Sequence, residues 1–312
     1  MKCLIADYMH NDIELLLSDA GFEADYRPDI SREEIKHLIA RYEGLIIRSK
    51  TKVDAELLRQ AGRLRFVARA GAGIDNLDVD ALNQRGIKII NAPEGNRNAV
   101  GEHCVAMLLA LLNNVAKADK EVRRGVWDRE GNRGYELQGK TVGLLGYGHM
   151  GQAFAQKLGS FACKVLAYDK YKRDYTDGHA QEASMEEIYE SADIFSIHVP
   201  LTAETRSMVG GAYMKRFKKN VFLINTARGE ILPLKDICEA IASGKILGAA
   251  LDVLENEKLN SLTVEQQKYF EFLVNSDKTI LTPHVAGWSF ESYEKINRVL
   301  VDKIINEFNG IE

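Results

Sequence analysis

The feature that most constrains the fold of this chain is a regular alternation of short apolar segments with helix-patterned segments. Four segments rich in Ile, Leu or Val, each followed by turn residues, are typical of strands: 3–6, 44–48, 65–69 and 87–90. Between them apolar residues recur at helical spacing, over 12–20, 32–41, 54–60 and 78–84. Ser31 and Glu34 form a capping-box pattern at the start of the second helix. Short strands joined by helices predict a parallel sheet covered on both faces.

A second alternating series follows a long helix that we expect over residues 98–124. Its strands are expected at 142–145, 165–168, 194–199, 221–225, 247–252 and 279–282, with a last helix at about 290–308. Because no strand follows that helix, we expect it to pack back on the first series. The sequence therefore predicts an α/β protein with two Rossmann-like or flavodoxin-like lobes, each built on a parallel sheet, and a ligand cleft between them.

Composition excludes several classes of protein. The 312 residues suggest about two domains, and 41 basic against 45 acidic residues give a net charge of −4, so we expect no nucleic-acid partner. The longest apolar run, Cys104–Leu112, is far shorter than the roughly 18 residues of a membrane span. The first residues read as a strand and not as a signal peptide. Four widely spaced cysteines without a CxxC pair indicate reduced thiols in a cytoplasmic protein, and no metal site.

Residues 140–151, KTVGLLGYGHMG, form a strand, a glycine loop and a helix start. Gly146 permits a tight turn, Gly148 allows close approach of a pyrophosphate, and Gly151 allows the helix to pack on the strand. The helix N-terminus at His149 and Met150 offers N–H groups to phosphates. The next strand ends in Asp169, where a carboxylate receives adenosine ribose hydroxyls and repels a 2′-phosphate, so NAD is favoured over NADP. The neighbouring cations Lys170, Lys172 and Arg173 could weaken that preference.

Three charged residues follow later strands of the second series: Arg228 in NTARG, Glu257 in LDVLENE and His284 in TPHVAG. A guanidinium can hold a carboxylate, an imidazole can take a hydroxyl proton at neutral pH, and a carboxylate can orient that imidazole. The set suits hydride transfer on a 2-hydroxy acid. Each residue also has a simpler explanation, since Arg228 and Glu257 could be solvated charges and His284 could cap a turn.

Together these motifs resemble the D-isomer-specific 2-hydroxyacid dehydrogenase family over nearly the whole chain. The resemblance implies a catalytic trio of Arg228, Glu257 and His284, a substrate-binding domain over 1–96 plus 288–312, and an NAD-binding Rossmann domain over 97–287. The chain departs from the family at Lys258, where a proline usually follows the catalytic Glu. The NAD-contacting residues that we expect are Gly146, Gly148, His149, Met150, Gly151, Asp169, His198, Val199, Pro200, Thr205, Thr226, Ala227, Arg228, Asp252, His284 and Gly287.

Within the family, residues 45–51 (LIIRSKT) and 69–76 (RAGAGIDN) look most like the phosphoglycerate dehydrogenases, in a short form without a C-terminal regulatory domain. The glycine turn would present N–H groups to a carboxylate. A phosphorylated substrate needs additional cations, for which Arg48, Lys50, Arg69 and Arg129 are the candidates. The substrate-contacting residues that we expect are Arg48, Ala70, Gly71, Ala72, Gly73, Arg129, Arg228 and His284.

The expected reaction is NAD-dependent oxidation of a D-2-hydroxy acid, with D-3-phosphoglycerate as first choice and serine biosynthesis as its context. Glyoxylate, hydroxypyruvate or D-lactate remain as alternative substrates of the same chemistry. A different class is an NAD-sensing protein like the transcriptional corepressors built on this fold. The apolar 98–124 helix and the family resemblance predict a homodimer with C2 symmetry.

Overall fold

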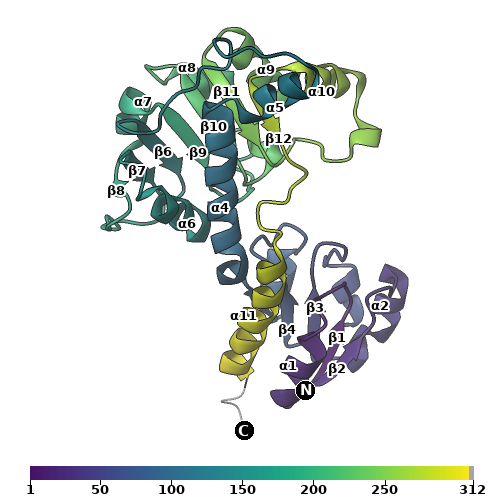
Figure 1. Cartoon of the computed structure of the whole chain (residues 1–312). Coiled ribbons are helices and arrows are strands. Elements are labelled where there is room, and N and C mark those ends of the chain that lie inside the picture. The colour runs from purple at the N-terminus through teal and green to yellow at the C-terminus, as the bar shows by residue number, and fades with distance from the viewer. Residues whose placement is uncertain (309–312) are drawn as a thin grey trace. The chain divides into compact units, whose positions relative to one another are not determined.

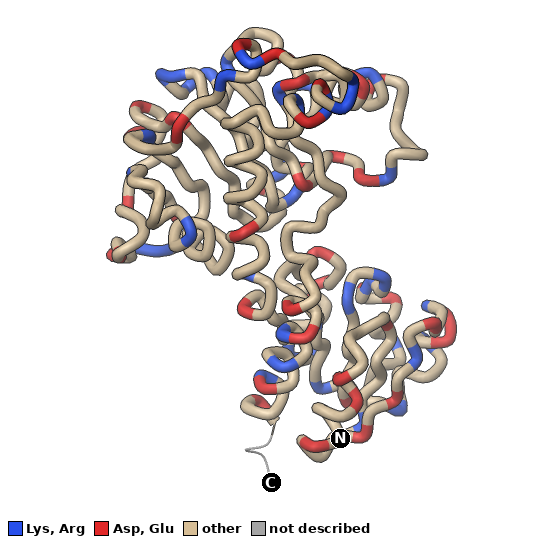
Figure 2. Tube along the Cα trace, in the orientation of Figure 1, with Lys and Arg blue, Asp and Glu red and all other residues tan. Residues whose placement is uncertain are grey.

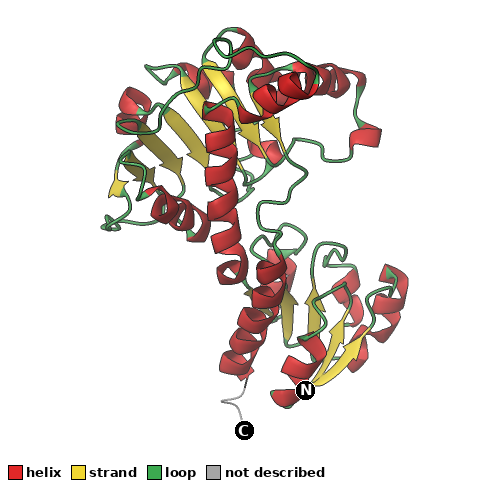
Figure 3. Ribbon diagram, in the orientation of Figure 1, coloured by secondary structure: helices red, strands yellow, loops and turns green. Residues whose placement is uncertain are grey.

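The computed structural model describes residues 1–308 and divides the chain into two compact units (Figure 1). Unit 1 comprises Met1–Arg97 and the chain from Trp288 onward, and unit 2 is Asn98–Gly287. Both units have parallel sheets with helices on both faces, so the predicted α/β class is confirmed (Figure 3).

Unit 1 contains a five-stranded parallel sheet in the order β2-β1-β3-β4-β5. This is the strand order of flavodoxin-like folds. The strands carry almost continuous apolar runs because helices bury both of their faces. Their bounds are β1 Lys2–Ile5, β2 Glu23–Tyr26, β3 Gly44–Ile47, β4 Phe66–Arg69 and β5 Lys88–Asn91.

Two hydrophobic clusters flank this sheet. On β3, Ile46 belongs to the cluster shared with α1 and α11, while Leu45 and Ile47 belong to the cluster shared with α2, η2 and α3. Helix α2 begins at the predicted capping box, with both reciprocal bonds of Ser31 and Glu34 formed. The helical elements are α1 Ile13–Asp19, α2 Arg32–Leu38, η1 Ile39–Arg41, η2 Leu57–Gln60, α3 Val79–Gln84 and α11 Phe290–Phe308.

Unit 2 contains a seven-stranded parallel sheet in the order β12-β11-β10-β9-β6-β7-β8. This is the Rossmann strand order with one strand added, and its switch point lies between β6 and β9. Ligands of such sheets bind at the carboxyl ends of the strands beside that point. The strand bounds are β6 Thr141–Leu145, β7 Lys164–Tyr168, β8 Gln181–Glu182, β9 Ile194–Ile197, β10 Val221–Asn225, β11 Ile246–Leu251 and β12 Thr279–Leu281.

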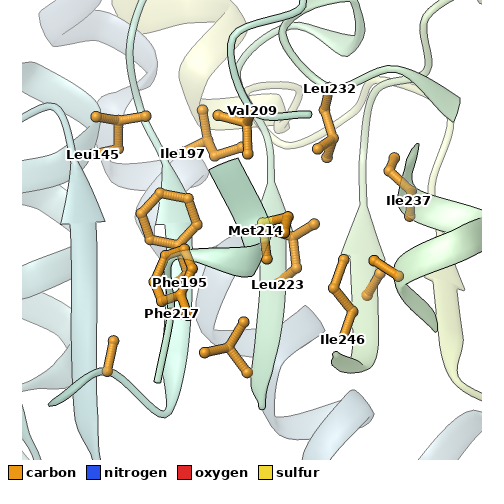
Figure 4. Close-up of a cluster of buried hydrophobic side chains, with 14 of the residues drawn as sticks. Leu145, Phe195, Ile197, Val209, Met214, Phe217, Leu223, Leu232, Ile237 and Ile246 are labelled. Atoms are coloured by element: carbon orange, nitrogen blue, oxygen red, sulfur yellow. The ribbon is translucent and has the colours of Figure 1, made fainter. Parts of the chain in front are cut away.

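One face of this sheet packs on α4 and α6, and the other packs on α7 to α10. Figure 4 shows the second cluster, in which Phe195, Leu223 and Ile246 project from neighbouring strands toward Phe217 and Ile237. The first residues of α4, up to Arg97, belong to unit 1. The helical elements are α4 Pro93–Leu112, α5 Val115–Arg123, α6 His149–Leu158, α7 Met185–Ser191, α8 Gly211–Lys215, η3 Gly229–Ile231, α9 Leu234–Ala242, η4 Leu259–Ser261 and α10 Val264–Asn275.

Several expected elements were wrong. The single helix predicted over 98–124 is two helices, α4 and α5, because Asn114 adopts a left-handed conformation with φ 52°. Helix α4 also starts earlier, at Pro93, a residue suited to the first turn because it lacks an N–H. The helix predicted over 54–60 is only the 3₁₀ turn η2. Strands β2 and β8 were not predicted, since neither EADY nor QE has the apolar pattern of a buried strand.

Acidic and basic residues are interspersed along α11 (Figure 2), where Lys303 Nζ bonds to Glu94 Oε2 at 2.7 Å and ties that helix to the start of α4. Among the described residues, no single helix is long and apolar enough to cross a membrane. The pair α4 and α5, bent by 61°, passes that test jointly on length and composition alone.

Candidate active site

The glycine loop between β6 and α6 is closely fitted to the next strand. Gly146 has φ +97°, and a Cβ there would lie 2.7 Å from the carbonyl oxygen of His198. A Cβ at Gly151 would lie 2.3 Å from the carbonyl oxygen of Gly146, so α6 can pack here only with glycine. Gly148 caps α6 and faces open space. The loop therefore leaves room at a helix N-terminus, which suits a pyrophosphate.

Asp169, at the end of β7, holds this loop by accepting hydrogen bonds from backbone N–H groups. Its Oδ2 accepts the Tyr147 N–H at 2.9 Å, and its Oδ1 accepts the N–H groups of Tyr171 and Lys172 at 3.0 and 3.2 Å. An ionised carboxylate has about four acceptor positions, so one remains for a ribose hydroxyl.

The nearby cations bond within this same part of the protein. Lys170 Nζ bonds to Glu204 at 2.5 Å, Lys172 Nζ to the Tyr147 carbonyl at 2.7 Å, and Arg173 to the Lys172 carbonyl at 2.6 Å. Lys170 is thus paired with an acid, whereas Lys172 and Arg173 bond to carbonyl oxygens and keep their charge beside the glycine loop and Asp169.

The loop after β9 faces the glycine loop through its backbone. The His198 ring turns inward, with Nε2 2.8 Å from Ser196 Oγ and its centroid 5.6 Å from that of Phe154. Burial lowers the pKa of His198 to about 4, so the ring is neutral at neutral pH. Val199 and Pro200 continue this loop, and the Thr205 hydroxyl bonds to the Pro200 carbonyl at 2.7 Å.

The turn carrying Arg228 is held by the buried side chain of Asn225. Its Oδ1 accepts the Ala227 N–H and its Nδ2 donates to the Arg228 carbonyl, both at 3.0 Å. The next residue, Gly229, contacts the loop after β11, since a Cβ there would lie 1.9 Å from the carbonyl carbon of Leu254. The loops after β10 and β11 are thus packed against each other.

The imidazole and carboxylate of the predicted trio are in direct contact. His284 Nδ1 lies 2.8 and 3.0 Å from the two carboxylate oxygens of Glu257. Their side chains are 43% and 47% exposed, so a ligand can reach them. Since Nδ1 is engaged, Nε2 is the ring nitrogen left for proton transfer. The nearby acid Glu255 has a different role from Glu257, because it accepts the Leu234 N–H at 3.0 Å and so caps α9.

Asp252, expected beside the cofactor, clamps the loop that carries His284. It is 1% exposed, and its two oxygens accept the N–H groups of Val285 and Ala286 at 2.9 and 2.8 Å. The His284 N–H bonds to the Asp252 carbonyl at 2.7 Å. Gly287 follows directly at the end of unit 2.

Lys258 changes how the loop after the predicted catalytic Glu is held. Its backbone N–H donates to Asn256 Oδ1 at 3.0 Å, a bond that a proline at this position could not make. Asn256 Nδ2 lies 3.3 Å from Gln266 on α10, so the loop is anchored by an Asn side chain.

Most of the predicted substrate residues belong to unit 1. Gly71 has φ +138°, and a Cβ there would collide with the Arg69 guanidinium, at 1.8 Å. The Ala70 N–H bonds to the Ile47 carbonyl at 2.8 Å, and the Ala72 carbonyl accepts from Asn91 at 2.6 Å. Gly73 continues this loop. Any N–H groups offered to a carboxylate would therefore come from positions after Ala70.

The Arg48 guanidinium lies over two aromatic rings, 3.6 Å from the centroid of Trp288 and 5.2 Å from that of Tyr293. Its loop is held by Asp7, which accepts the Arg48 N–H at 2.6 Å and the Thr51 hydroxyl at 2.5 Å. Burial lowers the pKa of Arg48 from its usual value.

Two of the three other cations considered for a phosphate, Lys50 and Arg129, are placed differently from Arg48. Lys50 Nζ donates to the carbonyls of Pro28 and Ile30 at 2.5 and 3.1 Å, so it holds the loop between β2 and α2. Arg129 is exposed on the loop 124–139 of unit 2. Sequence reasoning also missed Asp7 and Trp288, although a polar residue directly after a first strand is a usable signal for Asp7.

Among residues 1–308, no group of three His, Cys, Asp or Glu side chains is arranged to hold a metal ion.

Comparison with known proteins gives a consistent result. Residues 105–286 match the family described as D-isomer specific 2-hydroxyacid dehydrogenase, NAD binding domain. A D-3-phosphoglycerate dehydrogenase of Archaeoglobus fulgidus is 34% identical over all of this chain, which spans 58% of that relative's length. A glyoxylate reductase of Pyrococcus furiosus is 34% identical to this chain, and the alignment covers 95% of this chain and 88% of that relative's length. A D-lactate dehydrogenase of Aquifex aeolicus, solved with NAD and lactic acid, aligns with TM-score 0.83, 26% identity and coverage of 99% and 96%.

Proposed function

Because this chain belongs to the D-isomer specific 2-hydroxyacid dehydrogenase family and carries its NAD-binding domain, we propose that it oxidises or reduces a D-2-hydroxy/2-keto acid pair with NAD. The observation that carries the proposal is the contact between His284 Nδ1 and Glu257 at 2.8 Å, at the carboxyl edge of the Rossmann sheet. Such a pair is suited to exchanging a proton with a substrate hydroxyl or carbonyl.

Each residue of the trio has one task. Bound NAD would supply the acceptor for the hydride that leaves C2. His284 takes the hydroxyl proton on Nε2, while Glu257 fixes the ring orientation and stabilises the protonated imidazole. Arg228 holds the substrate carboxylate or polarises its carbonyl through its fork of N–H donors. In the reductive direction His284 returns the proton.

The cofactor preference follows from Asp169. Open space at Gly148, the N-terminus of α6 and the remaining acceptor position of Asp169 together fit a dinucleotide with free ribose hydroxyls. A 2′-phosphate would meet the Asp169 charge, and Lys170 is ion-paired with Glu204 at 2.5 Å. We expect a higher kcat/KM with NAD than with NADP, and a preference for NADP would overturn this assignment of Asp169.

As the physiological substrate we propose D-3-phosphoglycerate, oxidised to 3-phosphooxypyruvate. The support is Arg48, a half-buried guanidinium stacked 3.6 Å from the Trp288 centroid. Asp7 attracts it, but the Asp7 oxygens are already engaged by the Arg48 N–H and the Thr51 hydroxyl. A desolvated cation is stabilised by an incoming anion, and a phosphate would supply one. That unit 1 and unit 2 contact the same substrate molecule stays a prediction.

The test is a panel of phosphoglycerate, glycerate, D-lactate, glyoxylate and hydroxypyruvate with both cofactors, followed by NADH absorbance. We expect Arg48→Gln to raise KM for phosphoglycerate by about 10-fold or more, as for loss of a charge-assisted bond. The same variant should leave KM for D-lactate within about twofold. Arg59→Gln, an exposed arginine of η2, is the matched control. Equal kcat/KM for phosphorylated and unphosphorylated acids would contradict the phosphate assignment.

Two other functions are separated by the same panel. A glyoxylate, hydroxypyruvate or D-lactate enzyme would show its highest kcat/KM on that acid. A corepressor-like NAD sensor would bind NADH without turning over any of the acids. We also propose a cytoplasmic location, supported by the four unpaired cysteine thiols Cys3, Cys104, Cys163 and Cys238.

A further inference from the structure

The loop that carries His284 has a demanding backbone. His284 itself has φ +56°, a left-handed conformation that carries a steric penalty for any residue with a Cβ. Its N–H bonds to the Asp252 carbonyl at 2.7 Å, and the next two N–H groups bond to the Asp252 carboxylate. The position of the imidazole therefore depends on how firmly the Asp252 side chain is held.

Thr282 provides a further contact to that carboxylate. Its hydroxyl oxygen lies 2.5 Å from Asp252 Oδ1, and Asp252 is buried. An ionised carboxylate only accepts hydrogen bonds, so the Thr282 hydroxyl proton is donated to Asp252. The Thr282 oxygen can then only accept, and since the Met107 thioether 3.7 Å away has no proton to donate, one polar neighbour remains as the donor.

That neighbour is His103, on helix α4. Its Nε2 lies 3.1 Å from the Thr282 oxygen and 3.6 Å from Asp252 Oδ1. Because the Thr282 proton is already committed, the His103 nitrogen must carry a proton and donate it. The hydrogen-bond chain thus assigns the ring an Nε2–H form, which heavy-atom positions alone do not show.

Helix α4 supports a second site loop through the next residue. Cys104 Sγ lies 3.3 Å from the hydroxyl oxygen of Thr226, in the turn that carries Arg228. Consecutive residues of helix α4 therefore touch the loops of two members of the trio. A helix is more rigid than a loop, so contacts with α4 fix the positions of these two loops more precisely than contacts between the loops themselves.

From this chain of contacts, and resting on the dehydrogenase function proposed above, we propose that His103 is a positioning residue for proton transfer. It donates from Nε2 to Thr282, keeps the Thr282 proton directed at Asp252, and so holds the 282–286 loop that presents His284. It contacts neither substrate nor cofactor in this scheme.

The kinetic test compares His103→Leu with His103→Gln, whose side-chain amide can replace the lost N–H donor. We expect His103→Leu to lower kcat about 3- to 10-fold, as for loss of one partly buried hydrogen bond, with KM for NAD within about twofold. His103→Gln should recover most of that kcat, and the exposed His37→Gln should match the wild type. Thr282→Val combined with His103→Leu should be no worse than Thr282→Val alone, because the two residues act in series. An unchanged kcat in His103→Leu, or no rescue by Gln, would overturn the proposal.

A second measurement does not depend on turnover. In ¹⁵N-histidine-labelled wild type at pH 8, the His103 resonances, assigned by their loss in His103→Leu, should report protonation at Nε2. Protonation at Nδ1 alone would overturn the hydrogen-bond chain. If the wild type oxidised none of the acids while His103 still carried the Nε2 proton, the dehydrogenase proposal would fail and the structural assignment would stand.

Discussion

At the scale of single residues, the site depends on polar side chains that hold the backbone of its loops through hydrogen bonds. The left-handed φ of +56° at His284 costs about 1–2 kcal/mol, which the N–H bonds to Asp252 offset. Arg228 has an ordinary extended backbone, with φ −143°, and Asn225 holds its turn with two bonds of 3.0 Å. Buried polar side chains thus hold the two charged groups that we propose act on substrate.

The sharpest prediction at this scale concerns His284 itself. His284→Ala should lower kcat by about 10²- to 10⁴-fold, the usual contribution of a general acid–base group. The affinity for NADH, measured by fluorescence titration, should change less than about twofold, because the substitution leaves the glycine loop intact. An unaltered kcat would remove His284 from the mechanism.

Burial of His198 predicts a pH effect on stability. Its pKa is lowered to about 4 in the folded protein, against about 6.5 in the unfolded chain. Between these values the unfolded state binds the extra proton, so the stabilisation present above pH 6.5 is lost as pH falls toward 4. The loss attributable to this residue is up to about 3 kcal/mol.

Thermal unfolding of wild type and His198→Asn from pH 7 to 4.5 measures this contribution. Asparagine has no titrating group, so its Tm should fall less steeply with acid than that of the wild type. Parallel Tm curves for the two proteins would refute a buried neutral His198.

At the scale of elements, loop-to-loop contact at the sheet edge matters more than the helices and strands taken singly. The turn after β10 meets the loop after β11 at Gly229, where no side chain fits between the turn and Leu254. The first of these loops carries Arg228 and the second carries Glu257. Separation of the two would therefore disturb both charges together.

Gly229→Ala should destabilise the fold by about 1–3 kcal/mol, the usual range for overpacking, because its Cβ would lie 1.9 Å from the Leu254 carbonyl carbon. Urea unfolding measures this change, and kcat should fall as well. Gly62→Ala is the matched control, since a Cβ at Gly62 meets nothing within 4 Å. Equal stability of the two variants would contradict the close approach.

At the scale of the whole molecule, the chain combines a flavodoxin-like sheet and a Rossmann sheet, each closed on both faces by its own helices. Unit 2 nevertheless leaves apolar side chains in water around the end of α5. Val122, Val126 and Trp127 are 51%, 47% and 85% exposed. Such exposure on one segment is typical of a surface that another molecule covers.

We expect a homodimer, with a mass by light scattering of twice 34.9 kDa. Trp127→Glu should shift the equilibrium toward monomer because it places a charge in the apolar contact. The exposed Tyr171→Glu is the control, since Tyr171 lies away from α5 in the sequence. A monomer at every concentration would contradict the expectation.

Local sequence determined the class of fold and the order of most elements. The strand Val221–Asn225 and the helix Phe290–Phe308 have the bounds expected from apolar periodicity, because burial of a strand or of one helix face imposes a short-range pattern. The glycine loop and Asp169 could also be predicted from local sequence, because their geometry is set within one strand–loop–helix unit and the strand that follows it.

Only the tertiary structure decided which distant side chains meet. His103 reaches Thr282, and Arg48 stacks on Trp288, although each pair is far apart in the sequence. The left-handed Asn114 divides a helix that apolar periodicity alone makes continuous. Periodicity indicates which face of an element is buried. Which element packs on that face, and which hydrogen bonds form there, depend on how the elements pack across the sheet.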